Sequence, residues 1–127
     1  MAGRGNGMTE ICKNHVMVLG QKYTIDIRSE KDDPELKSRY GYIFYSARQI
    51  VIQNLIEAWV KDPVKYSIAK MREACRHEIV HAFLYESGLH DSSARLSDGW
   101  ATNEEMVDWF AIQSPKIYKA MKEAKCL

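Results

Sequence analysis

The sequence H-E-x-x-H at residues 77–81 constrains the fold of this chain more than any other feature. Its two histidines, His77 and His81, are four residues apart, so an α-helix turns both imidazoles to one face, where they can bind one metal ion. The motif continues into the apolar stretch 79–84, and unpaired His and Glu side chains are costly to bury in such surroundings. We therefore expect a largely buried helix with a metal-binding face.

Glu78 gives the motif a chemical role beyond metal binding. It follows the first histidine directly, where its carboxylate can reach a metal-bound water and act as a general base. A structural zinc site favours cysteines, usually has four protein ligands and needs no such base. The pattern is typical of a zinc-dependent hydrolase and predicts one Zn²⁺ per chain.

Two histidines do not complete a catalytic zinc site, which usually has three protein ligands and an open position for water. The other two histidines of the chain, His15 and His90, are candidates for the third ligand. An acid within residues 103–108, at the start of a second predicted helix, is the stronger candidate. Such an acid can face the motif helix if the two helices pack together.

Spacing favours one of the two glutamates in that segment. Thr102 and Glu105 have the T-x-x-E spacing of a helix capping box, which gives Glu105 a local structural role. Glu104 is then free to bind the metal as the third ligand, with Glu105 as the alternative. Asp108 is four residues after Glu104 and shares its face, so it can accept a hydrogen bond from a metal-bound histidine and fix its orientation.

Residues 103–108, N-E-E-M-V-D, match the N-E-x-x-x-D pattern that follows H-E-x-x-H in the thermolysin-like zinc peptidases, the gluzincins, and the chain resembles that family. Segments 76–89 and 103–115 also resemble small zincin-like proteins encoded by phages and prophages and, more distantly, the ImmA/IrrE metallopeptidases. Thermolysin itself is far larger, and its second lobe supplies part of the substrate cleft. The sequence shows no match to the histidine that serves its transition state.

The resemblance implies a zinc metalloendopeptidase. Zinc bound by His77, His81 and Glu104 would lower the pKa of a water ligand toward about 7. Glu78 would take the proton of this water as it attacks a peptide carbonyl, and would then pass it to the leaving amine. Asp108 would support a ligating histidine.

The oxyanion formed in such a reaction needs a hydrogen-bond donor in addition to zinc. The sequence offers Tyr66, Arg76, Tyr85 and His90 and does not choose among them. The strand predicted at residues 49–53 is, by position, the candidate for the edge strand beside the motif helix, where extended substrate would pair.

The order of predicted elements, strands first and helices afterwards, predicts an α+β fold in a single domain, residues 1–127. A small antiparallel or mixed sheet precedes the active-site helix and a C-terminal helix pair. Two hairpins are expected, the first from strands 15–19 and 23–27 and the second from strands 42–45 and 49–53.

The remaining segments have local signals. Asp62 is the expected N-cap of the motif helix, Gly88 its stop, and Pro115 the break between the two C-terminal helices, with Ser114 as cap. The predicted segments are a flexible tail at 1–9, a loop at 29–37, the motif helix at 63–87, a loop at 90–99, a helix from 102 and a final helix from 115 to 125.

Composition limits the partners and the compartment. The net charge is +1 and no apolar run is long enough to span a membrane, so we expect neither nucleic acid nor a membrane as partner. Three isolated cysteines, Cys12, Cys75 and Cys126, are typical of free thiols in the cytoplasm. The resemblance to phage and prophage proteins implies that this is the cytoplasm of a bacterium or a phage-infected host.

The expected partner is a protein or peptide substrate, and the likeness to ImmA suggests a regulatory protein. The alternative is a zinc-binding, non-catalytic interaction module of phage or prophage origin, which captures its partner without cutting it. Because such a module does not need a general base, the intact Glu78 favours the enzyme.

Overall fold

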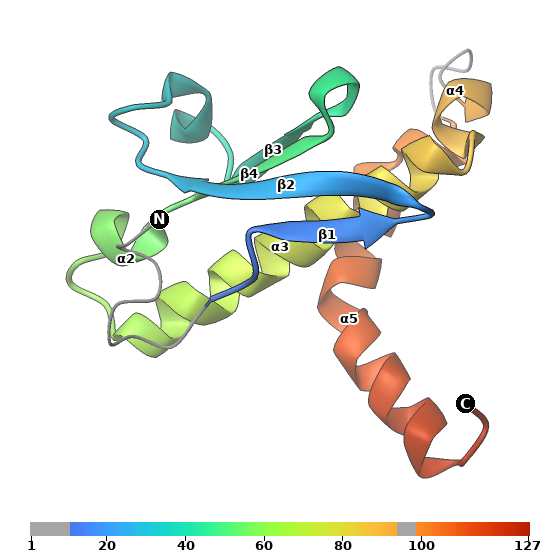
Figure 1. Cartoon of the computed structure of the whole chain (residues 1–127). Coiled ribbons are helices and arrows are strands. Elements are labelled where there is room, and N and C mark those ends of the chain that lie inside the picture. The colour runs from blue at the N-terminus through green and yellow to red at the C-terminus, as the bar shows by residue number, and fades with distance from the viewer. Residues whose placement is uncertain (1–10, 94–98) are drawn as a thin grey trace.

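The computed structural model describes residues 11–93 and 99–127 and shows the predicted α+β fold, a four-stranded sheet followed by helices (Figure 1). The predicted tail at residues 1–9 lies outside the described residues, as do residues 94–98 of the predicted loop. The first part of that loop is instead a short helix, α4 (Leu89–Ser93). Within the two described ranges, no helix has both the length and the apolar character that a membrane crossing needs.

The sheet consists of two antiparallel hairpins joined by a parallel pair. β1 (His15–Val18) pairs with β2 (Gln21–Arg28), and β3 (Gly41–Phe44) pairs with β4 (Gln49–Gln53), which confirms both predicted hairpins. β2 and β4 are parallel neighbours, so the strand order is β1-β2-β4-β3 and the sheet is mixed.

The prediction that residues 49–53 form an edge strand is wrong. β4 lies between β2 and β3, and its residues Ile50, Val51 and Ile52 are at most 1% exposed. Consecutive apolar residues without polar alternation are typical of a central strand that is covered on both faces. The edge position next to β4 belongs to β3, whose residues are half-buried or exposed.

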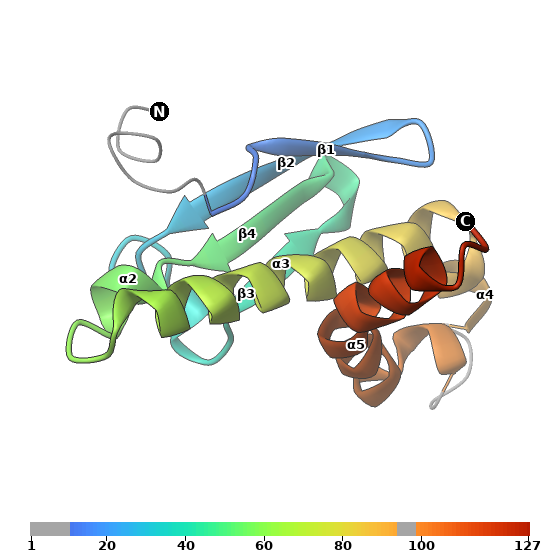
Figure 2. The ribbon, with the colours of Figure 1, turned by 90° about the horizontal axis from the view of Figure 1, so that it is seen from below.

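The H-E-x-x-H motif lies on α3 (Val64–Glu86), the long helix that packs along one face of the sheet (Figures 1 and 2). The predicted cap at Asp62 is wrong, because Pro63 keeps an extended conformation with ψ 135° and the helix begins one residue later. The predicted stop is confirmed: Gly88 follows the C-cap with φ 86°, a conformation that favours glycine.

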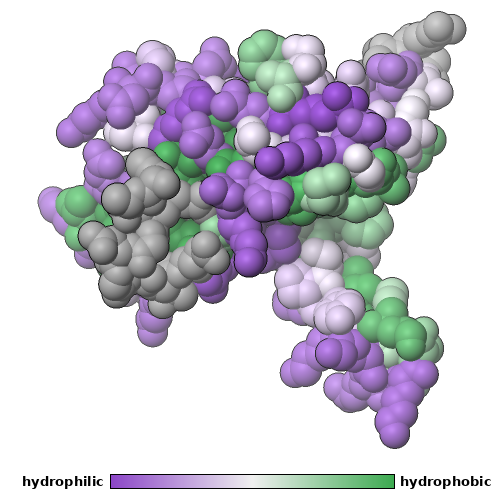
Figure 3. All heavy atoms as spheres, viewed as in Figure 1, coloured by the Kyte–Doolittle hydropathy of each residue, from purple (hydrophilic) through white to green (hydrophobic). Residues whose placement is uncertain are grey.

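The last helix, α5 (Glu104–Glu123), contacts α3 through its first half and then extends away from the body (Figures 1 and 2). Hydrophobic residues gather along one side of this projecting part (Figure 3). The predicted break at Pro115 is wrong, and Ser114 lies inside a continuous helix rather than at a cap. The carbonyl of Ala111, whose usual helical donor would be the missing N–H of residue 115, accepts a hydrogen bond from Arg76 of α3.

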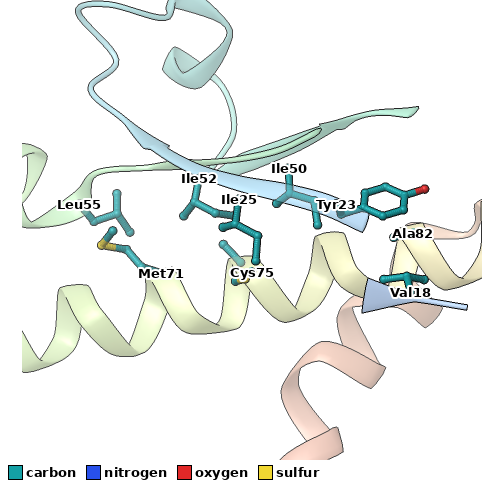
Figure 4. Close-up of a cluster of buried hydrophobic side chains, with 10 residues drawn as sticks. Val18, Tyr23, Ile25, Ile50, Ile52, Leu55, Met71, Cys75 and Ala82 are labelled. Carbon is teal, nitrogen blue, oxygen red and sulfur yellow. The ribbon is translucent and has the colours of Figure 1, made fainter. Parts of the chain in front are cut away.

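Shorter elements complete the fold and two cores hold it together. The main core lies between the sheet and α3 (Figure 4) and includes Tyr23, Ile25, Ile50, Ile52, Leu55, Met71 and Cys75. A much smaller cluster, made of Leu84, Ala101 and Val107, joins α3 to α5. The shorter elements are α2 (Leu55–Ala58) and the 3₁₀ helices η1 (Pro34–Lys37), η2 (Tyr45–Ala47) and η3 (Trp100–Thr102).

Candidate metal centre

The two histidines of the motif point to one place. His77 and His81 are one turn apart on α3, and their Nε2 atoms are 3.2 Å apart. His81 is buried and His77 is half-buried, so neighbouring residues restrict the orientation of both rings. The helical spacing of the motif therefore produces the convergence that the sequence predicts.

Glu104 brings a carboxylate to the same place from α5. Its Oε1 atom lies 3.2 Å from His77 Nε2 and 2.9 Å from His81 Nε2. Glu104 is the first residue of α5, and Asn103 is the N-cap, with its side-chain oxygen accepting a hydrogen bond from the Met106 N–H at 2.8 Å. The start of this helix therefore fixes where the carboxylate emerges.

Glu104, and not Glu105, lies beside the two histidines, but the predicted cap does not explain this. The predicted capping box is wrong, because the Thr102 hydroxyl donates to the Gly99 carbonyl at 3.0 Å and the helix begins after Asn103. Glu105 has no capping role and lines a separate hollow beside Trp109, away from the histidines. Glu105 is therefore separated from the histidines because its side chain lies on a different face of α5.

The three candidate ligand atoms lie close enough together for one zinc ion to reach all of them. Their mutual distances are 3.2, 3.2 and 2.9 Å, so the circle through them has a radius of about 1.8 Å, which is shorter than the zinc bonds of about 2.0–2.2 Å to nitrogen and oxygen. A single ion can thus reach all three atoms at normal bond lengths. His77, Glu78 and His81 also place ligand atoms within 4.8 Å of one another, but the shorter distances of Glu104 make it the better third ligand.

Asp108 decides which nitrogen of His77 faces the centre. Its Oδ1 atom lies 2.7 Å from His77 Nδ1, so Nδ1 donates its proton there and a neutral His77 presents the Nε2 lone pair. That lone pair faces the Glu104 carboxylate oxygen, and two acceptors this close repel each other unless a cation or a proton lies between them. Two imidazoles and one carboxylate are a donor set that suits zinc.

Replacing Glu104 with Gln is expected to lower the zinc affinity by more than about 100-fold, beyond the effect typical of residues that only support ligands, because a neutral amide replaces the charged ligand. Glu105→Gln is the matched control and should bind zinc as the wild type does. Competition with a chromophoric chelator measures both affinities. Wild-type affinity in Glu104→Gln would exclude Glu104 as a ligand.

Glu78 lies beside the ligands but is much more deeply buried than Glu104. It is 5% exposed, and burial raises the pKa of its carboxyl to about 8 in the metal-free chain. The nearby charges of Glu104 and Asp108 add to the effect of burial within this rise, whereas the Arg39 guanidinium opposes it. A carboxylate whose pKa lies near neutrality can both accept and release a proton, which is the property required of a general base that later acts as an acid.

A cleft of about 470 Å³ opens over these groups, between β3, α3 and α5. Its β3 side includes Gly41, where a Cβ atom would come within 2.8 Å of the Val51 carbonyl oxygen and 3.5 Å of Glu78 Oε2. Only glycine therefore fits at this point of the strand beside the base. The cleft is lined on this side by Arg39, Gly41, Tyr42, Ile43 and Tyr45.

Tyr45, which the sequence did not single out, lines the cleft together with Tyr42, whose hydroxyl already donates to Asp33 at 2.6 Å. Burial raises the pKa of Tyr45 to about 12, with further contributions from Glu78 and Glu104, so it keeps its proton at neutral pH and can donate a hydrogen bond. Its ring stacks on Tyr85 at a centroid distance of 4.7 Å and contacts His90 at 4.8 Å. The only signal in the sequence was its place at the end of a predicted strand.

The structure does not bring the four predicted oxyanion donors into this cleft. Tyr85 and His90 pack behind Tyr45, Tyr66 is 57% exposed on the first turns of α3, and Arg76 contacts α5. The alternative third ligands are also separate from the centre. His15 is exposed on β1 and bonds to Asn14, and His90 belongs to the aromatic cluster.

The comparisons with known proteins add no relative. No family model, curated protein or solved structure matches this chain.

Proposed function

We propose that this chain is a zinc-dependent metalloendopeptidase that hydrolyses a peptide bond in a protein or peptide substrate. One observation carries the proposal: His77, His81 and Glu104 converge to within 3.2 Å beside the buried carboxyl of Glu78, at an open cleft. The candidate metal ligands, a general base and a cleft for substrate thus occur at one place. A hydrolase requires this combination, whereas a purely structural metal site does not.

Different residues of the chain have separate roles in such a reaction. A zinc ion held here would supply Lewis-acid chemistry, activating water and polarising the scissile carbonyl. Glu78 accepts a proton from the attacking water and delivers it to the leaving amine. Asp108 holds His77 in the tautomer that presents Nε2, and Tyr45 donates a hydrogen bond to the oxyanion.

An extended peptide is the substrate that the cleft fits best. In the described sheet β3 pairs with β4 on one side only, and Gly41, Tyr42 and Ile43 of β3 line the cleft. A peptide can therefore pair with the free edge of β3 while its backbone passes the metal ligands. A smaller adjoining hollow of about 220 Å³, between Tyr40, Lys70 and Glu73, offers space for one of its side chains.

Replacing Tyr45 with Phe is expected to lower kcat by about 10²–10³-fold, the loss typical of one oxyanion donor, with little change in zinc affinity. Tyr85→Phe is the matched control, since Tyr85 stacks on Tyr45 from outside the cleft and should retain near wild-type kcat. Steady-state kinetics on a cleaved peptide measure both. Equal kcat values for Tyr45→Phe and the wild type would remove Tyr45 from the mechanism.

Elemental analysis combined with a peptide-library digestion tests the proposed function. We expect about one zinc per chain and a reproducible set of cleaved peptide bonds in mass spectra. Stoichiometric zinc without cleavage of any peptide would support the interaction module instead. Failure to retain zinc after loading and removal of excess metal would contradict both readings.

A further inference from the structure

Arg76, the residue before the motif, reaches from α3 to α5. Its Nε donates a hydrogen bond to the Ala111 carbonyl oxygen at 2.5 Å, and Ala111 is only 1% exposed. The bond therefore lies inside the interface between the two helices, where a hydrogen bond from a charged donor is stronger than one between neutral groups.

Pro115 is the reason that this carbonyl accepts an outside donor. In a regular helix the Ala111 oxygen would accept from the N–H of residue 115. Proline has no N–H, and its ring displaces the carbonyl four residues earlier. Since Pro115 lies inside the continuous α5, Arg76 replaces the donor that the proline removes.

The hydrogen bond of Arg76 lies on the same face of α5 as the contacts of the candidate metal centre. Glu104, Asp108 and Ala111 are spaced by four and three residues, so they share one face of α5. Each meets α3 through a polar contact, and along α5 these are Glu104 with His81 at 2.9 Å, Asp108 with His77 at 2.7 Å and Ala111 with Arg76 at 2.5 Å.

Within α5, the buried residues are Val107 and Ala111. The side chains of Glu104 and Asp108 are 67% and 62% exposed, and the apolar contact with α3 is the small cluster around Val107. We propose that Arg76 is a positioning residue for the metal centre: by binding the carbonyl that Pro115 frees, it fixes α5 so that Glu104 and Asp108 reach the histidines. This inference rests on the proposed zinc site.

Replacing Arg76 with Met, which keeps the length of the side chain and removes the donor, tests the inference. We expect a loss of about 10-fold or more in zinc affinity, the effect typical of groups that orient ligands. The Co²⁺-substituted protein should show altered visible absorption, which reports ligand geometry. Arg76→Lys retains a charged donor and should recover part of the affinity.

Arg72→Met is the matched control. Arg72 lies four residues earlier on α3 and donates its Nε to another carbonyl, that of Ile11, at 2.9 Å, away from α5. This variant should keep the wild-type zinc affinity and Co²⁺ spectrum. Equal losses in Arg72→Met and Arg76→Met would indicate general destabilisation and overturn the proposal.

Pro115→Ala tests the role of the proline that leaves the Ala111 carbonyl free for Arg76. Restoring the N–H should draw the Ala111 carbonyl back into the helix, so Pro115→Ala should also lower the zinc affinity, and adding Arg76→Met should then cost little more. Independent, additive losses would contradict the pairing of Arg76 with Pro115.

The same variants separate this inference from the proposed function. If the wild type binds zinc but Arg76→Met binds it equally well with an unchanged Co²⁺ spectrum, the positioning role is wrong and the enzyme proposal stands. If the wild type binds no zinc, the enzyme proposal fails. In that case, NMR of the His77 ring in metal-free protein still reports the Asp108 contact, which Arg76→Met should weaken and the control Arg72→Met should not if the inference holds.

Discussion

Replacing Glu78 with Gln is expected to reduce peptide hydrolysis by about 10²–10⁴-fold, the contribution typical of a general base, while the protein still binds one zinc per chain. Gln has nearly the size and shape of Glu, so the buried site remains filled, but its amide cannot take a proton from water. The variant thus removes the proposed proton transfer and keeps the proposed ligands His77, His81 and Glu104. Measuring kcat and zinc content on the same preparation checks the prediction.

A matched control is available on the same helix. Glu73 lies five residues before Glu78, lines the adjoining hollow and pairs with Lys70 at 2.8 Å, without reaching the metal ligands. Glu73→Gln should therefore keep kcat near the wild-type value, although its KM can change with the substrate side chain in that hollow. Full activity in Glu78→Gln, with zinc bound, would mean that another group is the base.

The metal-free protein is expected to lose stability between about pH 5 and pH 8 because of Glu78. In the unfolded chain its carboxyl releases a proton near the ordinary pKa of 4.5, whereas the folded chain retains it to about pH 8. Between these values the unfolded state binds fewer protons, so the free energy of unfolding falls as the pH rises. The effect should be on the order of a few kcal/mol.

Comparison with Glu78→Gln isolates this effect from other titrations. Burial lowers the pKa of His81, which acts in the opposite direction because the unfolded histidine binds a proton that the folded one excludes. Both proteins contain that histidine, so the difference between their urea midpoints from pH 5 to pH 8 reports Glu78. Parallel pH profiles in the two proteins would show that the carboxyl is not perturbed. Bound zinc should reduce the difference, since a cation favours the ionised carboxyl.

Local patterns predicted the helix of the motif and both hairpins because those elements depend on residues close in sequence. The four-residue spacing of His77 and His81 is enough to define a helix face, and Gly88 marks its end. The edge strand was predicted wrongly because pairing between β2 and β4 joins residues far apart in the chain. Only the unbroken run Ile50, Val51 and Ile52 indicated a central strand.

The C-terminal part shows where local rules fail for tertiary reasons. Pro115 should disrupt a helix, but Arg76 from another helix occupies the carbonyl that the proline leaves free. Tyr45 was missed because its place in the cleft depends on how β3 meets α3, which no spacing reveals. Glu104 was identified with the wrong cap, since Asn103 and Thr102 both have side chains suited to that position.

The two unequal cores imply that the molecule does not open as one unit. The sheet and α3 share a large apolar interior, whereas the apolar cluster between α3 and α5 is small, with Leu84, Ala101 and Val107 buried and Val80 and Met106 packed against them. Amide protons in the first half of α5 should therefore exchange with solvent through local opening, at a lower free energy than those in β4. A metal ion bound by His81 and Glu104, as proposed, would cross-link α3 and α5 across this interface. Metal binding would then couple α5 to the cooperative unfolding of the rest of the chain.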